Sequence, residues 1–297
     1  MSGPVRRATS AAAAFSTAPF DGARPTAARL TAGARDAAGG RLIPRRPTVI
    51  GATAAAVLLS CALLLGAGCG DASSPEPPAN SRDWSTFLDD VKRDFPFQQP
   101  EPIIRHFFRD RRGGFFVDVG AAHYRNGNNT YYLEQQLGWS GIAIDALEKW
   151  GPEYAEHRPR TKFFAYIVTD HAGTEDPFFH ISGDIGSTAI PERADRIKQI
   201  APATEVQEVL VPTITLNDLL DLEGVTRIDL LAMDIEQGEP RALAGFDIQR
   251  FAPTLVCIEH LPEVQDAILA YFREHGYRRI DRYLEYDGAN WYFTPGQ

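Results

Sequence analysis

From residue 84 onward, short apolar runs alternate with segments of helical periodicity almost to the end of the chain. Because strand–helix–strand units build a parallel sheet, this alternation predicts an α/β fold. The expected strands cover residues 115–119, 141–144, 162–168, 176–181, 206–212, 228–233, 254–258, 277–284 and 289–294. The expected helices lie near residues 84–92, 101–109, 129–137, 148–156, 190–199 and 262–276, with one more around residue 240.

The end of the chain carries clear helix and turn signals. A helix over residues 262–276 would bury Val264, Ile268 and Phe272, which are spaced four residues apart. The two strands after it are separated by a segment containing Asp287-Gly288, a dipeptide that favours hairpin turns. We therefore expect an antiparallel hairpin at the edge of a sheet whose other strands are mostly parallel.

Residues 47–69 form a long apolar stretch without any charged residue. About 20 apolar residues suffice to cross a bilayer as a helix. Arg45 and Arg46 directly precede the stretch, so the positive-inside rule predicts a cytoplasmic N-terminus and an extracytoplasmic remainder. The segment is either an uncleaved membrane anchor or a lipoprotein-type signal cut before Cys69, and the sequence leaves both open.

The rest of the chain divides by composition. Residues 1–46 are rich in Ala, Arg, Thr, Gly and Pro with few large apolar side chains, so we expect them to be disordered. They are either a targeting peptide or an inert extension. Residues 70–82 form a Pro- and Ser-rich linker, and residues 83–297 are expected to form one folded domain.

Charge is distributed unevenly along the chain. Of the 297 residues, 44% are apolar and 23% are charged, and the formal net charge is −9. Residues 1–48 carry a net charge of +6, which leaves −15 for the remainder. Sequence-independent binding of nucleic acid requires a basic face, so we expect a small or uncharged substrate and no nucleic-acid partner. The folded domain holds only Cys257, which excludes a disulfide within it.

Three acidic residues end expected strands: Asp118, Asp145 and Asp234. In an open α/β sheet, ligands bind outside the carboxyl ends of the strands. Gly120 and Ala121 follow Asp118 and allow a tight turn beside a ligand. A carboxylate at this point would repel a pyrophosphate and attract a cationic amine, which favours S-adenosylmethionine over NAD. No G-x-G-x-x-G motif follows the first strand, and this argues against a dinucleotide-binding dehydrogenase.

Each of these carboxylates has an expected role toward S-adenosylmethionine. Asp118 would bind the amino group of the methionyl moiety, directly or through water. Asp145 would accept hydrogen bonds from the ribose hydroxyls, and Asp234 would lie near the transferred methyl group. Asn129 begins the helix after the first strand, where it would cap the helix, contact the cofactor, or do both.

Five segments of the chain carry a family resemblance: Val117-Asp118-Val119-Gly120-Ala121, Asn129-Thr130-Tyr131, Gly138-Trp139-Ser140-Gly141-Ile142-Ala143-Ile144-Asp145, Val211-Pro212-Thr213-Ile214-Thr215-Leu216-Asn217-Asp218-Leu219-Leu220 and Ile228-Asp229-Leu230-Leu231-Ala232-Met233-Asp234-Ile235-Glu236. In this order, over roughly residues 113–294, they resemble the FkbM family of methyltransferases. The resemblance implies a Rossmann-like class I fold with a mostly parallel, seven-stranded sheet. It also implies S-adenosylmethionine as cofactor and, usually, O-methylation of a sugar or natural-product hydroxyl.

The family often has Asp-Val-Glu-Gly after the fourth strand, whereas Gln237 stands in place of that glycine here. Methyl transfer to a hydroxyl needs a base, and the candidates at the mouth of the site are His123, Asp234, Glu236 and His260. Asp234, Glu236, Glu259 and His260 could alternatively bind a divalent cation. A helix-dipole role for Glu236 and a capping role for His260 explain these residues as well, and we expect no metal.

The sequence therefore predicts a membrane-attached, S-adenosylmethionine-dependent O-methyltransferase that acts on a glycan or small metabolite, in an unknown oligomeric state. One objection is that the cofactor is made in the cytosol, whereas Arg45 and Arg46 place the domain outside. The alternative function is a catalytically inactive, methyltransferase-like binding or trafficking module at a membrane.

Overall fold

The computed structural model describes residues 82–94, 100–184 and 186–296. The expected disordered segment, the expected membrane or signal segment at 47–69 and the linker up to residue 81 lie outside these residues. Within the described ranges, no helix combines the length and the apolar character needed to cross a membrane.

Seven strands form one sheet in the order β3-β2-β1-β7-β8-β10-β9. Their bounds are β1 Phe115–Val119, β2 Ser140–Asp145, β3 Thr161–Ala165, β7 Leu230–Met233, β8 Leu255–Glu259, β9 Tyr277–Arg279 and β10 Asn290–Pro295. The paired strands are parallel except where β10 pairs with β8 and β9. Strand order reverses between β1 and β7, where open α/β sheets bind ligands. The predicted class I fold is confirmed.

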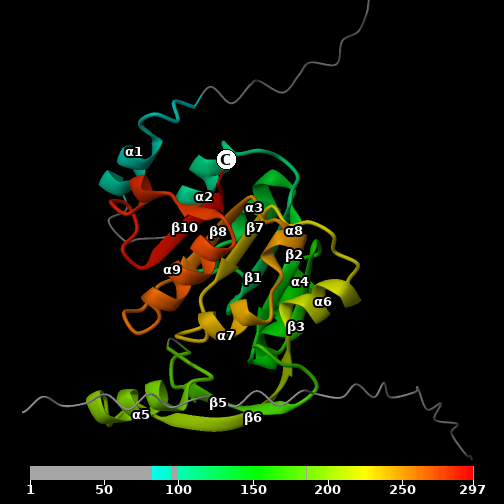
Figure 1. Cartoon of the computed structure of the whole chain (residues 1–297), viewed down its shortest axis with the longest axis vertical. Helices are drawn as coiled ribbons and strands as arrows, with labels where there is room; N and C mark the ends of the chain where they lie inside the picture. Colours follow the sequence, from blue (N-terminus) through cyan, green and yellow to red (C-terminus); the bar gives the residue numbers. More distant parts are fainter. Residues whose placement is uncertain (1–81, 95–99, 185, 297) are drawn as a thin grey trace, which may run out of the picture. The chain divides into compact units, whose positions relative to one another are not determined.

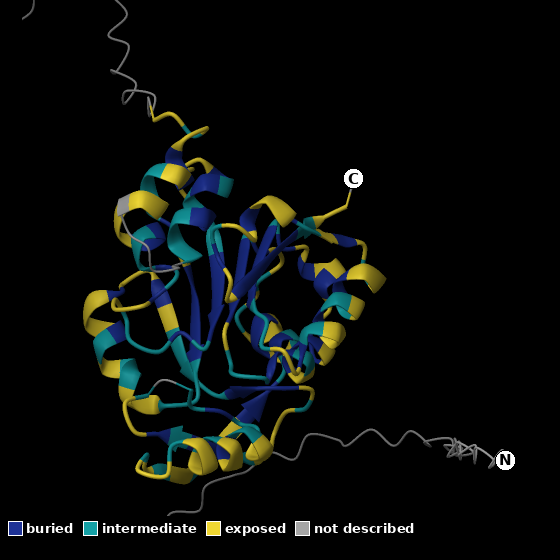
Figure 2. Ribbon diagram, turned by 90° about the vertical axis from the view of Figure 1, so that its left-hand side faces the viewer, coloured by how far each residue is buried: buried dark blue, intermediate teal, exposed yellow. Residues whose placement is uncertain are grey.

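Helices cover both faces of this sheet, as Figure 2 shows by the buried strands between partly exposed helices. The α-helices are α1 Phe87–Asp94, α2 Pro100–Phe108, α3 Tyr131–Leu137, α4 Gly151–His157, α5 Pro191–Ile200, α6 Leu216–Leu222, α7 Glu239–Ala244, α8 Ile248–Phe251 and α9 Gln265–Glu274, with 3₁₀ helices η1 Glu148–Trp150 and η2 Asp281–Tyr283. In β1, Val117 and Val119 pack in one core with residues of α6, α7 and α9, whereas Phe116 packs in another with residues of α2 and α3. The alternation of side chains along a strand explains the two cores.

A second sheet, in the order β4-β6-β5, stands apart from the first. It contains β4 Ile167–Val168, β5 Glu175–Ile181 and β6 Val206–Ile214. We call β5, α5 and β6 the arm, and Figure 1 shows them together as a separate layer at the lower end of the view. The expected strand 162–168 is therefore two strands: β3 pairs with β2 until β2 ends at Asp145, and β4 then pairs with β6.

The C-terminal strands pair antiparallel as expected, but the turn between them differs from the prediction. β9 ends at Arg279 instead of continuing to residue 284, and η2 follows it. Asp287, only 1% exposed, accepts hydrogen bonds from Asn290 N–H (3.1 Å) and the Tyr292 hydroxyl (2.7 Å). The Asp-Gly pair therefore does not form a two-residue hairpin turn, because the Asp287 side chain organises a longer connection.

Helices α6 and α8 were not predicted from the sequence. The signal for α6 was present, because Thr215 Oγ1 accepts a hydrogen bond from Asp218 N–H at 3.0 Å and so caps the helix. Leu216, Leu219 and Leu220 then bury one face of α6.

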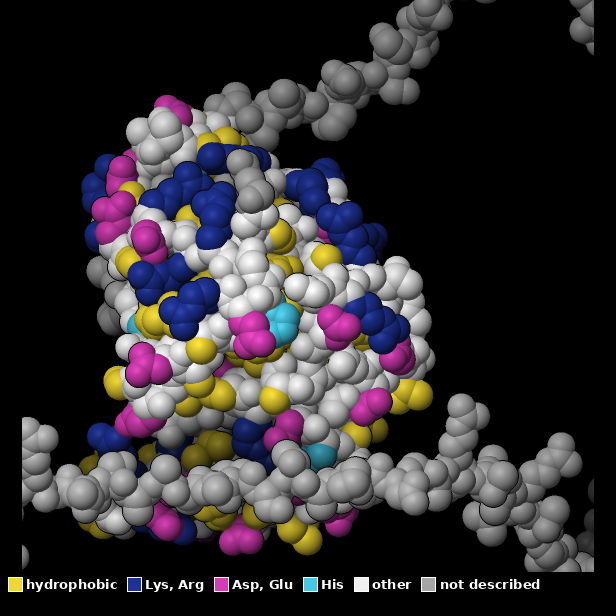
Figure 3. All heavy atoms as spheres, viewed as in Figure 1, with side chains coloured by type: hydrophobic (Ala, Val, Ile, Leu, Met, Phe, Trp, Pro, Cys, Tyr) yellow, Lys and Arg dark blue, Asp and Glu magenta, His cyan; other side chains and the backbone are white. Residues whose placement is uncertain are grey.

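Charged side chains of both signs are spread over the surface. In Figure 3, Lys and Arg side chains lie mainly over the upper half of the face drawn, and Asp and Glu side chains are scattered over the whole face. The expected absence of a nucleic-acid partner stays a prediction.

Candidate active site

A cavity of about 700 Å³ lies at the carboxyl ends of β1, β2 and β7. Ligand pockets in proteins have volumes of roughly 300–1,000 Å³. The residues predicted to bind the cofactor all line this cavity: Asp118, Gly120, Ala121, Asn129, Asp145 and Asp234. The fold thus brings together residues that are far apart in the sequence.

The turn after β1 passes unusually close to the loop after β7. Gly120 has a φ of +82°, a left-handed conformation that favours glycine. A Cβ at this position would lie 1.8 Å from the carbonyl oxygen of Asp234, so the chain would have to move. Gly120 N–H donates to the carbonyl of Ile144 at 2.8 Å. The turn is therefore held between the ends of β2 and β7, along the wall of the cavity.

Asp118 is buried, with 2% of its surface exposed, and it lines the cavity. Its Oδ2 accepts hydrogen bonds from Thr130 Oγ1 at 2.8 Å and from Asn128 Nδ2 at 3.4 Å. Burial raises the pKa of Asp118 to about 6, although these hydrogen bonds and the charge of Arg158 oppose the rise. Asp118 therefore changes its charge close to neutral pH.

Arg158 holds the partners of Asp118 in place, and sequence reasoning missed it. Its guanidinium, 1% exposed, forms an ion pair with the buried Glu134. It also donates to Asn128 Oδ1 at 3.1 Å and to Thr130 Oγ1 at 3.2 Å. A buried charge must be paired and hydrogen-bonded, so this network fixes the two residues that bind Asp118. The local sequence gives no signal for it, because Arg158 follows α4 in an ordinary polar turn.

Asp145 is oriented by the backbone on both carboxylate oxygens. Ala122 N–H donates to Oδ2 at 3.0 Å, and Leu147 N–H donates to Oδ1 at 2.8 Å. Burial raises the pKa of Asp145. Each oxygen keeps a second lone pair that can accept from a hydroxyl. A fixed carboxylate with two free acceptor sites suits a pair of neighbouring hydroxyls, the role predicted for it.

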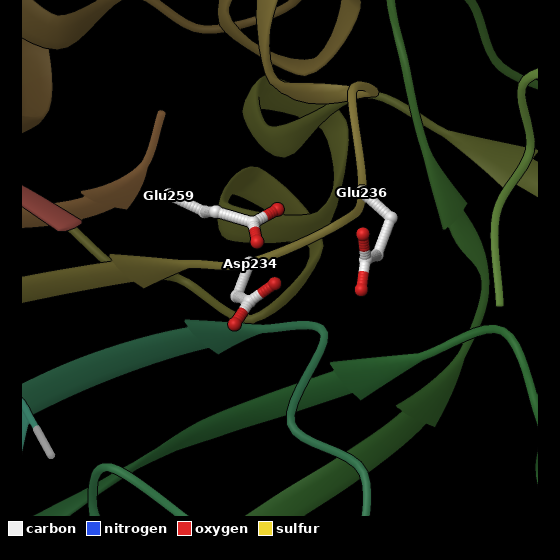
Figure 4. A group of neighbouring side chains, drawn as sticks. All are labelled: Asp234, Glu236 and Glu259. Atoms are coloured by element: carbon white, nitrogen blue, oxygen red, sulfur yellow. The ribbon is translucent and has the colours of Figure 1, made fainter. Parts of the chain in front are cut away.

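Asp234, Glu236 and Glu259 form a carboxylate cluster at the ends of β7 and β8, shown in Figure 4. One oxygen from each lies within 4.8 Å of the others. Asp234 is exposed to the cavity, but protein atoms crowd its other sides, and this burial raises its pKa. Burial and the neighbouring carboxylates raise the pKa of Glu259 to about 9. At neutral pH Glu259 therefore carries a proton, which it can donate to Asp234 in a hydrogen bond.

The carboxylate cluster offers the hard oxygen ligands that a divalent cation prefers. His260, considered as a further ligand from the sequence, is not part of this group. Arg193 already pairs with Glu236. Glu239, fully buried beside the cluster, accepts from Ile235 N–H at 2.9 Å, and burial raises its pKa to about 7. Protonation and Arg193 thus compensate the negative charge, and the absence of a metal stays a prediction.

The loop after β7 holds two consecutive residues in the left-handed region, Glu236 with φ +56° and Gln237 with φ +77°. This conformation costs about 1–2 kcal/mol for most residues that have a Cβ. Gln237 stands where the FkbM family often has glycine, so the departure adds strain at this point. Backbone strain of this kind concentrates at functional sites.

The two histidines considered as bases lie in different surroundings. His123 lines the cavity, and its Nδ1 accepts from Arg125 N–H and Asn126 N–H, both at 3.0 Å. Only its Nε2 remains to exchange a proton. His260 is not among the cavity-lining residues; it stacks on Trp291 with ring centroids 4.2 Å apart, and burial lowers its pKa. Both catalytic roles stay predictions.

Comparison with known proteins identifies a family for most of the folded region. Residues 118–279 match the family model described as the methyltransferase FkbM domain. A curated relative, 31-O-demethyl-FK506 methyltransferase FkbM of Streptomyces tacrolimicus, is 23% identical over 203 residues, which cover 59% of this chain and 76% of the relative.

Two solved structures are similar at low sequence identity. One is a TehB-like SAM-dependent methyltransferase from Corynebacterium glutamicum ATCC 13032, with 12% identity, coverage of 71% of this chain and 96% of the other, and a TM-score of 0.39. The other is the 1,6-didemethyltoxoflavin-N1-methyltransferase of Burkholderia thailandensis with bound 1,6-didemethyltoxoflavin and S-adenosylhomocysteine, with 15% identity, coverage of 71% and 82%, and a TM-score of 0.32. Because both TM-scores lie below 0.5, we draw nothing about function from them.

Proposed function

This chain belongs to the FkbM family of methyltransferases, and on that premise we propose that it transfers a methyl group from S-adenosylmethionine to a hydroxyl of a glycan or small metabolite. The observation that carries the proposal is one cavity lined by both Asp118 and Asp145, which lie at the carboxyl ends of the adjacent strands β1 and β2 beside the Gly120 turn. S-adenosylmethionine has an ammonium group at one end and a ribose diol in its middle. The two carboxylates match these two groups.

We expect different residues of the cavity to bind different parts of the cofactor. Asp145 would accept hydrogen bonds from both ribose hydroxyls, because the backbone already orients its two oxygens. Asp118 would pair with the ammonium group. Gly120 and Ala121 line the cavity and would contact the methionyl chain, and Asn129 would contact the same end of the cofactor.

S-adenosylmethionine supplies an electrophilic methyl group on a positively charged sulfur. Holding the acceptor oxygen in line with that group provides much of the rate. Asp234 is the base that we favour, because it is exposed to the cavity and lies beside Glu259, whose proton, donated in a hydrogen bond, would favour the ionised form of Asp234. It would take the hydroxyl proton as the new C–O bond forms and the S–CH₃ bond breaks. Glu236 and His123 line the cavity as well and remain candidates for the base. His260 is a weaker candidate, because it is not among the residues that line the cavity.

A neutral hydroxyl acceptor fits the charge of the cavity. Most ionisable side chains that line it are acidic, and Arg125 adds a guanidinium. The acidic residues are Glu101, Asp118, Asp145, Asp184, Asp234 and Glu236. Such a lining would repel an anionic acceptor. The S. tacrolimicus relative is named for methylating an O-demethyl compound, which supports oxygen as the acceptor atom here.

Membrane attachment through residues 47–69, with the domain of residues 83–297 on the extracytoplasmic side, also belongs to the proposal. Its support is the uncharged apolar run and the preceding Arg45 and Arg46. Protease treatment of intact cells that express the full chain would degrade the domain if this orientation holds. If the domain is protected until the cells are lysed, the proposed orientation is wrong. The domain would then lie in the cytosol, where the cofactor is made.

Calorimetric titration of the full-length protein with S-adenosylmethionine and S-adenosylhomocysteine tests the cofactor. We expect both to bind, and Asp145→Ala to weaken both by about 10–100-fold, since hydrogen bonds to a charged group contribute about 1.5–3 kcal/mol. Asp266→Ala is the matched control, because Asp266 is exposed on α9 and does not line the cavity. A folded wild-type protein that binds neither compound would disprove the proposed function.

A further inference from the structure

The arm reaches the carboxylate cluster through Arg193 of α5. The Arg193 guanidinium pairs with the Glu236 carboxylate, and the two side chains are largely buried, at 19% and 17% exposure. The arm enters the chain between β4 and α6, whereas Glu236 follows β7. Partly buried, charge-assisted contacts of this kind are stronger than those on the surface. This ion pair therefore ties the arm to the loop that carries Asp234.

Thr188, just before α5, makes a second contact with the same loop. Its buried hydroxyl donates to the carbonyl oxygen of Glu236 at 2.8 Å. Arg193 and Thr188 thus hold both the side chain and the backbone of Glu236. Because Glu236 and Gln237 adopt strained left-handed conformations, the loop depends on surrounding contacts to keep its shape.

Arg193 also provides positive charge where several acidic groups face Asp234. Those groups are Asp118 of β1, Glu259 of β8, Asp287 before β10, Glu236 of the same loop and Glu239 of α7. Against them, Arg193 lowers the pKa of Asp234, Glu236 and Glu259. Without this guanidinium, the cluster would hold more of its protons at neutral pH.

We propose that Arg193 is a positioning residue for methyl transfer, which clamps the Glu236 loop beside the cavity and places a positive charge among the carboxyl groups around Asp234. The inference rests on the proposed function. During transfer, the acceptor O–H bond breaks and its proton passes to Asp234, while the C–O bond forms and the S–CH₃ bond breaks. Arg193 exchanges no proton. A protonated Asp234 cannot take up the acceptor's proton. Through Arg193, the arm would therefore influence how readily Asp234 acts as the base, although Asp234 lies outside the arm.

Carbon-13 NMR of the unliganded full-length protein, labelled at the Asp and Glu carboxyl carbons, tests this directly. Asp234→Asn assigns the Asp234 resonance. We expect Arg193→Gln to raise the pKa of Asp234 by about one unit, because removal of a nearby guanidinium shifts a carboxyl by about that much or more. Arg193→Lys keeps a positive charge and should restore most of the wild-type titration.

Arg196→Gln is the matched control on the same helix. Arg196 pairs with Glu263 at the surface, where their side chains are 65% and 41% exposed. We expect this variant to titrate like the wild type at Asp234. Arg193→Met, which keeps most of the aliphatic stem without the charge, replaces Arg193→Gln if the latter does not fold.

Calorimetry with S-adenosylhomocysteine on the same proteins separates the two hypotheses. Unchanged affinity together with the shifted Asp234 titration would support the inference. Unchanged affinity with an Asp234 titration like that of the wild type would overturn it and leave the proposed function standing. A wild-type protein that binds neither S-adenosylmethionine nor S-adenosylhomocysteine would overturn the proposed function and the inference with it.

Discussion

At the residue scale, Asp118 combines a recognisable sequence position with a charge state that burial produces. It lies in β1, two residues before Gly120, which is why the sequence marks it as a ligand-binding carboxylate. Its pKa of about 6 comes from its 2% exposure, since an aspartate in water titrates near 4. The site therefore holds a carboxylate that is largely ionised at pH 7 and largely protonated at pH 5.

This charge state predicts a pH-dependent affinity for the cofactor. In the proposed complex, ionised Asp118, whose pKa is about 6, would attract the ammonium group of S-adenosylmethionine. Binding should therefore weaken by about tenfold between pH 7 and pH 5, because only about a tenth of the carboxyl groups are ionised at pH 5. Calorimetric titration at the two pH values measures the effect.

Asp118→Asn should weaken binding at pH 7 and leave affinity nearly the same at the two pH values. Asp266→Asn, on the exposed face of α9, is the control and should retain the wild-type dependence. A wild-type affinity that does not change over this range would contradict the role of Asp118 in binding the ammonium group.

At the element scale, the segment from β1 through the Gly120 turn follows its local sequence closely. β1 covers Phe115–Val119, as predicted. The turn needs a residue without a Cβ, because Gly120 approaches the Asp234 carbonyl. Elements whose partners lie far away in sequence followed prediction less well: the strand at 162–168 divides where its pairing changes from β2 to β6.

Two glycine substitutions separate the effect of backbone conformation from that of close approach. Gly120 and Gly224 have similar φ values, +82° and +66°, but a Cβ on Gly224 would meet nothing within 4 Å. Gly224→Ala should lower the free energy of unfolding by about 1 kcal/mol, the conformational term alone. Gly120→Ala adds the collision with Asp234, and overpacking costs about a further 1–3 kcal/mol.

Thermal or urea unfolding of the two variants measures the difference. We also expect Gly120→Ala to lose affinity for S-adenosylhomocysteine, since its turn lines the cavity, whereas Gly224→Ala keeps it. Equal destabilisation by both substitutions would show that the close approach to Asp234 has no energetic consequence.

At the scale of the whole molecule, the fold gathers carboxyl groups that keep their protons near and above neutral pH. Burial raises the pKa of Glu239 to about 7 and that of Glu259 to about 9. In the unfolded chain both would titrate near 4.3. Their folded pKa values are raised, so the folded state binds more protons than the unfolded state between about pH 5 and pH 9. Stability is then lost as pH rises through the folded values.

We therefore expect the melting temperature of the unliganded protein to fall between pH 7 and pH 9. Each extra proton held by the folded state contributes a slope of about 1.4 kcal/mol per pH unit. Glu259→Gln, which resembles the protonated form, should make this fall shallower. Glu263→Gln, at an exposed site, should leave it as in the wild type. An identical slope in Glu259→Gln and wild type would contradict the raised pKa of Glu259.

The candidate site was predictable as far as single residues were concerned. Asp118, Asp145 and Asp234 each stand at or next to the end of an apolar run, and parallel strands present such ends at one edge of the sheet. The partners of these residues were not predictable. Asn128 and Arg158 carry no local signal of the contacts that they make around Asp118, because their partners lie far away in the sequence. Glu239 lies in the first turn of α7, where acidic residues are common, so its burial was not predictable either.

The sequence by itself determined the α/β class, the succession of the main strands along the chain and the acidic residues at strand ends that line the cavity. These depend on apolar periodicity and on the residues at strand ends, both of which act over a few neighbouring positions. The tertiary structure alone decided that Arg158 supports Asp118, that Glu259 stands protonated beside Asp234 and that Arg193 crosses from the arm to Glu236. Such pairings and charge states depend on burial and on contacts between distant segments, which no local pattern of residues encodes.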